Sequence, residues 1–152
     1  MSAVFVDADA CPVKDEVIRV ITRHGVTVHM VSNGWLRLEE NPLIDRVVVP
    51  QGPDVADDWI AERAGRGDVV VTGDIPLASR CLANGARVIG HGGRPFTEAG
   101  IGSALAMREL TAHLRETGEM KGGGPMFSKK DRLRFLDALE RELTAARRET
   151  GA

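Results

Sequence analysis

Aspartates recur at three places in this chain where a hydrophobic strand ends or the following helix begins. Asp7 and Asp9 follow a run of valine and phenylalanine, three more lie within residues 54–58, and Asp74 comes shortly after three valines. In open parallel sheets, ligands bind outside the carboxyl ends of the strands, where neighbouring loops converge. Carboxylates gathered there repel one another unless a cation lies among them. We therefore expect Asp7, Asp9 and Asp74 to face one site.

The spacing of these carboxylates favours oxygen-only ligation of a metal ion. Side chains alternate along a strand, so Asp7 and Asp9 point to the same side, and Asp74 would complete a three-carboxylate set if its strand is adjacent. Oxygen ligands suit Mg²⁺ or Mn²⁺, which can lower the pKa of a bound water and offset charge on a phosphodiester under attack. The helical carboxylates that could join them, three or four positions apart on one helix face, are Asp54 with Asp57 or Asp58.

Helix capping is the alternative interpretation of the same residues. A side chain at a strand-to-helix turn often accepts a hydrogen bond from the first turn of the helix, and Asp9, Asp54 and Asp74 each precede a predicted helix. Capping accounts for one aspartate per helix and leaves Asp7 and one helical carboxylate without a role. A shared metal site is therefore the hypothesis that covers the whole group.

The elements that must position these residues alternate along the chain. Short runs rich in valine and isoleucine are separated by longer amphipathic stretches, which is typical of βαβ units and a parallel sheet. We expect strands over 3–7, 26–31, 46–49, 68–72 and 87–90. We expect helices over 13–24, 54–66, 76–84, 98–117 and 129–148. The sequence thus predicts an α/β fold, a three-layer sandwich around a central, mostly parallel sheet, with an additional C-terminal helix.

Local signals set several helix ends. Gly25 is expected to end the first helix in a left-handed conformation, and Asn84 with Gly85 to end the third. Ser128, followed three residues later by Asp131, predicts a capped start for the last helix. Leucines recur along that helix at helical spacing and are expected to dock on the domain: Leu133, Leu136, Leu139 and Leu143.

Length and charge indicate one globular unit with a distinct end. The 152 residues are 43% hydrophobic, enough for one domain with a sizeable core. We divide them into a metal-binding domain over 1–120 and a segment over 121–152, made of a glycine hinge and a basic amphipathic helix packed on the same domain. The segment 121–152 has eight basic and five acidic residues, a balance of +3, which leaves −5 for the rest. The acidic part suits metal and the basic part suits phosphate.

Other features of the composition narrow the class of protein. No run approaches the ~20 apolar residues of a membrane span, and no secretory signal begins the chain, so we expect a cytoplasmic protein with no membrane partner. Cys11 and Cys81 form no CxxC motif, so we interpret both as reduced structural residues. Aromatic residues are 4% of the chain, with no tyrosine, which disfavours base-stacking platforms. An RNA partner would be held through its backbone and shape.

Six polar residues outside the aspartates are candidate substrate contacts. Asn33 follows the second strand, Arg80 lies on the helix after Asp74, and Arg94 follows the last expected strand; the other three begin the last helix, as Lys129, Lys130 and Arg132. Arginine and lysine bind phosphate through charge-assisted hydrogen bonds. The alternative is ordinary: a plain turn around Asn33, a strand exit at Arg94 and solvated helix faces for the rest.

Four motifs in this order resemble one protein family. They are the segments Val6–Lys14, Gly52–Asp58, Val71–Ala78 and Gly124–Arg132. Together they are similar to the YaiI/YqxD family of bacterial proteins, over nearly the whole chain. That family is in turn similar to the PIN-like (NYN) nucleases, which gather acidic residues at strand ends and cut RNA with magnesium or manganese. The resemblance implies that the catalytic ligands are Asp7, Asp9, Asp58 and Asp74. Asp54 is a further candidate metal ligand from its spacing on the helix.

Two other functions fit parts of the same pattern. Asp7 and Asp9 resemble the nucleophile and acid/base pair of haloacid-dehalogenase-like phosphatases, Ser32–Asn33 their second motif, and Gly73–Asp74 their metal motif. That class usually has a lysine before the metal motif, and none is evident here. The other alternative is a non-catalytic module that binds RNA or a protein partner. The working hypothesis is a Mg²⁺- or Mn²⁺-dependent ribonuclease.

Overall fold

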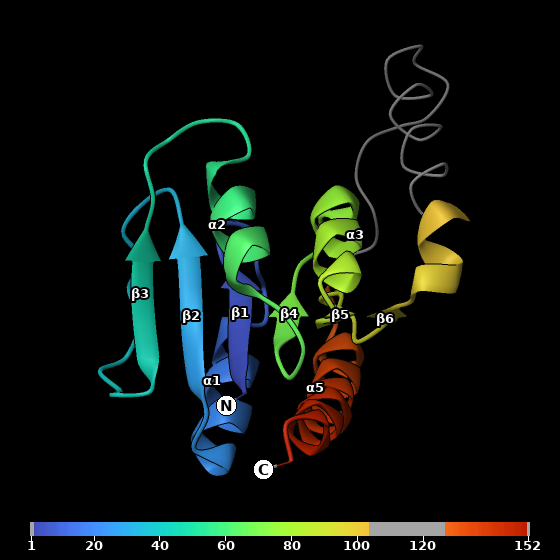
Figure 1. The fold of residues 1–152 in the computed structure, drawn as a ribbon. Helices are drawn as coiled ribbons and strands as arrows, with labels where there is room; N and C mark the ends of the chain where they lie inside the picture. The colour runs from blue at the N-terminus through green and yellow to red at the C-terminus, as the bar shows by residue number, and fades with distance from the viewer. Residues whose placement is uncertain (1, 104–126, 152) are drawn as a thin grey trace.

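A six-stranded sheet forms the centre of the computed structural model, which describes residues 2–103 and 127–151 (Figure 1). The strands are β1 Ala3–Asp7, β2 Thr27–Ser32, β3 Ile44–Val48, β4 Val69–Val71, β5 Arg87–Ile89 and β6 Pro95–Phe96. Their order in space is β3-β2-β1-β4-β5-β6. The first five are parallel, and only β6 pairs antiparallel. The mostly parallel sheet is confirmed; β6, whose two residues carry no alternation signal, was not predicted.

The helices that flank this sheet lie close to their predicted positions. Those with both ends described are α1 Lys14–His24, α2 Val55–Arg63, α3 Ile75–Ala83 and α5 Lys129–Glu149. The helix predicted over 54–66 ends three residues earlier than expected, because the chain is already extended at Ala64. Residues 98–103 are helical, as expected for the start of the helix predicted over 98–117. The remainder of that helix and the predicted glycine hinge lie outside the described residues.

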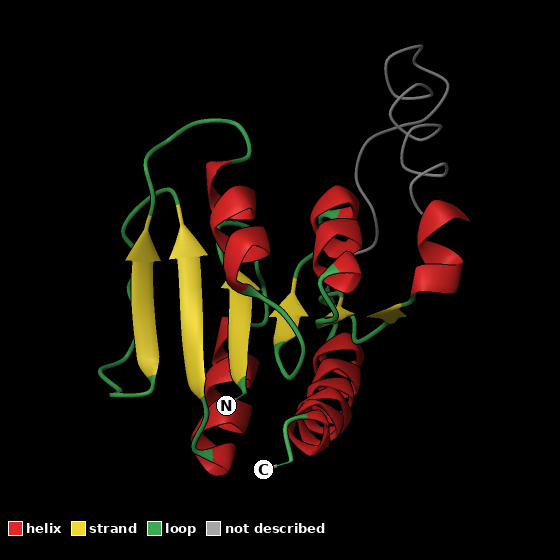
Figure 2. Cartoon of the chain, in the orientation of Figure 1, coloured by secondary structure: helices red, strands yellow, loops and turns green. Residues whose placement is uncertain are grey.

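The helices cover both faces of the sheet, which gives the predicted three layers (Figure 2). Alternate strand residues belong to different cores: Val4 and Val6 pack with α1 and α5, while Phe5 packs with α2 and α3. Strands buried on both faces read as continuous apolar runs, as the three valines of β4 do. Within the residues described, no helix has the length and apolar character needed to cross a membrane.

The last helix, α5, belongs to the same core as α1. Its buried residues are Phe135, Ala138, Leu139, Leu143 and Ala146. The predicted leucine stripe is therefore wrong at its first member, since Leu133 is 56% exposed. Leu133 lies two residues before Phe135, about 200° around the helix, so it must face solvent when Phe135 faces the core.

Local geometry fixes where α1 and α5 begin and end. Gly25 ends α1 with φ 68°, and Ser128 and Asp131 form a reciprocal capping box at the start of α5, as predicted. Gly93 has φ +88°, and a Cβ there would lie 2.8 Å from the carbonyl oxygen of Arg134. Only glycine allows the loop after β5 to approach α5 so closely.

Candidate functional site

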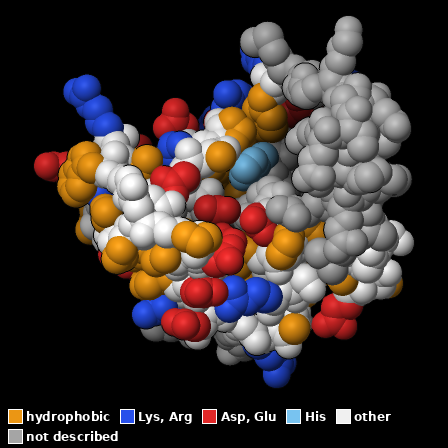
Figure 3. Space-filling model, turned by 90° about the horizontal axis from the view of Figure 1, so that it is seen from above, with side chains coloured by type: hydrophobic (Ala, Val, Ile, Leu, Met, Phe, Trp, Pro, Cys, Tyr) orange, Lys and Arg blue, Asp and Glu red, His pale blue; other side chains and the backbone are white. Residues whose placement is uncertain are grey.

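The carboxyl edge of the sheet brings the predicted aspartates together. Strands β1 and β4 are neighbours, with Val6 opposite Val71, so Asp7 and Thr72 leave the sheet side by side. Seen from above this edge, acidic side chains gather near its centre (Figure 3). This is the position where ligands bind in open parallel sheets.

Thr72 joins the Asp7 carboxylate to the backbone of Asp74 and is fully buried. Its hydroxyl donates to Asp7 Oδ2 at 3.1 Å and accepts the backbone N–H of Asp74 at 3.0 Å. One side chain thus fixes the end of β1 relative to the loop after β4. No distinctive signal in the sequence predicts this role, because a threonine after a strand of valines is common.

Capping accounts for one of the three aspartates that precede helices. Asp74 Oδ1 accepts the backbone N–H of Leu77 at 2.9 Å and caps α3. Asp54 occupies the N-cap position of α2, but its side chain makes no capping bond and its φ is 65°, a left-handed value. Asp9 instead accepts the backbone N–H of Asn33, at 3.0 and 3.2 Å to its two oxygens. The site therefore contains carboxylates that capping does not explain.

Burial and mutual repulsion raise the pKa values of two of the carboxyl groups. Burial, reinforced by the charges of Asp74, Asp7 and Asp54, raises the pKa of Asp57 to about 6. Burial also raises the pKa of Asp7; the hydrogen bond from Thr72 lowers it in part, and the charges of Asp74 and Asp9 raise it further. These effects require the carboxylates to be near one another, because charge interactions weaken with distance.

Of the two neighbouring carboxylates on α2, Asp57 is the one whose pKa is raised by burial and by the charges of Asp74 and Asp7. Asp58 accepts a hydrogen bond from Arg80 at 2.7 Å, with both side chains about half exposed. Consecutive residues lie about 100° apart on a helix, so only one of this pair can face Asp7 and Asp74. Spacing left Asp57 and Asp58 as alternatives and the resemblance pointed to Asp58; the charges that act on Asp57 favour it as the helical candidate, and the choice stays a prediction.

The donor set fits a hard cation held largely by water. Among residues 2–103 and 127–151, no three His, Cys, Asp or Glu side chains converge closely enough to hold a metal as they stand. Mg²⁺ typically keeps several waters and is bound through one or two carboxylates together with substrate phosphates. Asp7 and Asp74, whose loop Thr72 joins to the end of β1, would offer an ion of that kind one or two carboxylates.

A histidine lies next to the Asp74 loop. A Cβ built on Gly73 would be 3.4 Å from the His91 ring. His91 Nε2 is buried and has no hydrogen-bond partner among the residues described, and burial, with the nearby charge of Lys14, lowers its pKa. Lys14 Nζ itself donates to the carbonyl oxygens of Ala8 and Cys11, at 3.3 and 2.9 Å. Lys14 therefore holds the loop after β1 closed, with its charge near His91.

Three of the predicted substrate contacts are engaged within the protein. Asn33 donates its side-chain amide to the carbonyl oxygen of Pro50 at 3.1 Å. Arg80 is paired with Asp58. Arg132 contacts Glu16 at 3.0 Å and lies over the Phe127 ring, 5.2 Å from its centroid. In this structure these three side chains stabilise loops and the packing of helices.

The other three predicted substrate contacts, Arg94, Lys129 and Lys130, are exposed and make no ion pair with another residue in the described ranges.

Both cysteines are buried, and burial raises the pKa of each thiol to about 11. A thiol with so high a pKa is almost wholly protonated at pH 7 and is a poor nucleophile.

Comparison with known proteins identifies the family. A family model described as "Uncharacterized BCR, YaiI/YqxD family" matches residues 5–145. The chain belongs to the YaiI/YqxD family. A UPF0178 protein of Parvibaculum lavamentivorans is 64% identical over 148 residues, 97% of each chain, and one of Ruegeria pomeroyi is 60% identical over 98% of each. A third, from Roseobacter denitrificans, is 58% identical over 96% of this chain and 97% of its own. No solved structure matches the chain.

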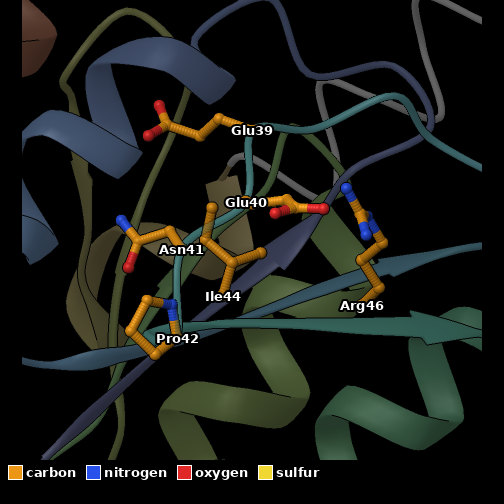
Figure 4. A pocket seen from close by; sticks show the side chains of 6 residues that line it. All are labelled: Glu39, Glu40, Asn41, Pro42, Ile44 and Arg46. Carbon is orange, nitrogen blue, oxygen red and sulfur yellow. The ribbon is translucent and has the colours of Figure 1, made fainter.

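A separate hollow of about 510 Å³ lies beside β3 (Figure 4). It is lined by Glu39, Glu40, Asn41, Pro42, Ile44 and Arg46. Arg46 donates to the carbonyl oxygen of Leu38 and lies over the Trp35 ring at 4.8 Å, and Asn41 donates to Thr22. Through these contacts Arg46 and Asn41 organise the β2–β3 loop.

Proposed function

We propose that this YaiI/YqxD protein is a metal-dependent nuclease that hydrolyses RNA phosphodiesters at the carboxyl edge of its sheet. One observation carries the proposal: Asp7, Asp57 and Asp74 come from three separate elements, and their charges act on one another at the position where parallel sheets bind ligands. Packing alone gives no reason for carboxylates from three elements to share this edge of the sheet. A cation among them would offset the repulsion.

Each residue has a definite task in this proposal. A bound Mg²⁺ or Mn²⁺ would lower the pKa of an attacking water and offset charge on the phosphate. Asp7 and Asp74 would hold it, at the separation that Thr72 sets, and Asp57 would bind a metal water or accept a proton. Asp9, whose carboxylate accepts the N–H of Asn33, would hold the β2 loop in place and contribute charge.

RNA is the proposed substrate for two reasons. The resemblance of the family to PIN-like nucleases favours it, and exposed cations border the acidic edge: Lys129 and Lys130 begin α5, and Arg94 follows β5. Contacts from flexible cations to phosphate oxygens position a strand without reading its sequence. The low aromatic content agrees with recognition through the backbone.

The test is cleavage of labelled single-stranded and structured RNA with Mn²⁺, Mg²⁺ or chelator. Asp74→Asn keeps a side chain that can cap α3, so a loss of activity would reflect the lost charge. We expect Asp7→Asn, Asp57→Asn and Asp74→Asn to lose at least about a hundredfold in activity, since even indirect supports of metal ligands cost 10- to 100-fold.

Asp58→Asn is the matched control, one residue along the same helix, and should keep activity within about threefold because its carboxylate is paired outside the site. Binding of Mn²⁺ by calorimetry gives a readout independent of turnover. RNA binding without cleavage in any metal would replace the nuclease with a non-catalytic binding module. A stable aspartyl-phosphate on Asp7 would replace it with a phosphatase.

A further inference from the structure

The outer surface of the α1/α5 layer carries an excess of positive charge. Its exposed cations are Arg19, Arg23, Lys129, Lys130, Arg134, Arg141 and Arg148. The exposed acidic residues on the same two helices are Asp15 and Asp137. On the opposite layer, α2 and α3, the exposed charges balance: Asp58, Glu62, Arg63 and Arg80. The α1/α5 face should therefore attract anions more strongly than the α2/α3 face.

Four of these cations form a line on α5, which we call the α5 stripe: Lys130, Arg134, Arg141 and Arg148. Successive members are four, seven and seven residues apart. At 100° per residue, this spacing keeps all four within about 40° of one another around the helix. With a rise of 1.5 Å per residue, the stripe is about 27 Å long. It is long enough to follow a nucleic-acid strand over several nucleotides.

Most of the α5 stripe has no ion-pair partner among residues 2–103 and 127–151. Lys130, Arg141 and Arg148 make no ion pair with any residue in the described part of the chain, and Arg134 meets only Asp131 of its own helix, at 3.4 Å. Across the molecule, by contrast, Arg80 is held by Asp58 at 2.7 Å. The charges of the stripe are thus available to an external anion.

The surface beside the far end of the stripe is hollowed. One hollow of about 460 Å³ and another of about 230 Å³ share Thr144 and Arg148 in their walls. Arg141 lines the first, and Arg147 the second. The carboxylate in this region, on Glu140, is already engaged by Arg23 and His24. The guanidinium groups of Arg141, Arg147 and Arg148 therefore line a concave surface together with the hydroxyl of Thr144. The carboxylate in this region is already neutralised by its partners.

The near end of the stripe adjoins the aspartate site. Arg132 donates to the carbonyl oxygen of Pro12, in the loop that leaves β1, and the carbonyl of Arg134 packs against Gly93, in the loop that leaves β5. Both loops begin at the carboxyl edge of the sheet. A strand lying along the stripe would therefore arrive at the rim of the carboxylates.

We propose that the α5 stripe is the binding track for the sugar-phosphate backbone of single-stranded RNA. The track binds phosphates without reading sequence and needs no metal. Its delivery of the strand to the carboxylates rests on the proposed nuclease function, whereas its affinity for RNA does not. The contacts that are new here, Arg141 and Arg148, lie far along α5 from the reacting groups, so they affect substrate binding rather than chemistry.

The test compares the full-length protein with Arg141→Gln/Arg148→Gln and a control, Arg37→Gln/Arg63→Gln. The control has the same net charge, with its changes on the β2–β3 loop and on α2. Binding of a fluorescent 16-nucleotide single-stranded RNA is measured by anisotropy in EDTA, from 50 to 200 mM KCl, after thermal melts show that both variants are folded. Single-strand contacts release about 0.7 counterions each, so losing two should weaken binding about 25-fold at 100 mM salt and reduce the log–log salt slope by about 1.4. The control should stay within about twofold.

The outcomes separate this proposal from the nuclease proposal. Intact RNA affinity in Asp74→Asn, with a 25-fold loss in the stripe variant, supports the track whether or not the wild type cleaves RNA. Equal weakening in the stripe variant and the control, or no RNA binding by the wild type, overturns it. Wild-type binding to vesicles with 30% anionic lipid but not to RNA also overturns it and assigns the stripe to a membrane surface. If cleavage occurs, an unchanged KM in the stripe variant counts against the track in the same way.

Discussion

Replacing Asp57 with asparagine should stabilise this protein at neutral pH. Asp57 is partly buried, and burial together with the charges of Asp74, Asp7 and Asp54 raises its pKa from 3.8 to about 6. At pH 7.5 the folded protein therefore holds an ionised group in a place that disfavours the charge. Asparagine has nearly the same shape and removes the charge.

The size of the effect follows from proton linkage. One pKa unit corresponds to about 1.4 kcal/mol, so a rise from 3.8 to about 6 costs at most about 3 kcal/mol once the group is ionised. Asp57 is partly exposed to water, which screens the repulsion, so we expect about 1–2 kcal/mol. For a raised carboxyl pKa the cost is absent below pH 3.8, grows as pH rises to about 6, and is constant above.

Urea or thermal unfolding from pH 4 to pH 8, in chelator, measures the difference between Asp57→Asn and wild type. At pH 7.5 the variant should melt about 3–8 °C higher, and at pH 4 the two should nearly coincide. Adding Mn²⁺ should shrink the gap by stabilising the wild type more than the variant. The matched control is Asp58→Asn, which loses an exposed pair with Arg80 and should be destabilised by about 0.5 kcal/mol or less. A difference that does not change with pH, or a less stable Asp57→Asn at pH 7.5, would refute the repulsion.

Three further predictions concern the contacts that hold the site and α5 in place, each measured as the free energy of unfolding. Thr72→Val leaves the Asp7 carboxylate and the Asp74 amide without their partner and should cost about 1–3 kcal/mol, while Thr72→Ser should cost less than about 1. Gly93→Ala combines a positive φ with a clash at 2.8 Å and should cost about 2 kcal/mol or more, whereas Gly92→Ala, with open space around it, should be nearly neutral. Phe135→Ala should cost about 3–5 kcal/mol because the ring is fully buried, and Leu133→Ala, on the exposed side of the same helix, less than about 0.5. Equal losses within any of these pairs would contradict the corresponding contact.

The sequence predicted the layers of this fold because each layer has its own periodicity. Valine runs such as β4 indicate buried parallel strands, and Gly25 and the Ser128–Asp131 box set helix ends through backbone rules that act locally. The two-residue strand β6 carries no such period. Leu133 was assigned to the wrong face because a spacing of three residues is compatible with more than one helical face. The sequence does not show that the buried face is the one that contains Phe135.

The site was harder to predict than the fold because its geometry depends on residues far apart in sequence. Strand-end position was enough to group Asp7 with Asp74, since parallel order places β1 beside β4. The choice between Asp57 and Asp58 depends on which way α2 is turned about its axis, which no local pattern records. The link through Thr72 joins positions 65 residues apart, and a threonine after a strand is equally compatible with simple packing.

Several features at this one edge reduce stability without helping to pack the core. Asp57 is ionised at neutral pH against the charges around it, and Asp54 adopts a left-handed φ of 65° with no capping bond in return. His91 buries a ring nitrogen that has no partner in the described part of the chain. Strain and unpaired polar groups persist in proteins chiefly where binding or catalysis uses them. Their convergence beside Asp7 and Asp74 is the physical reason to look for the chemistry of this protein at the carboxyl edge of the sheet.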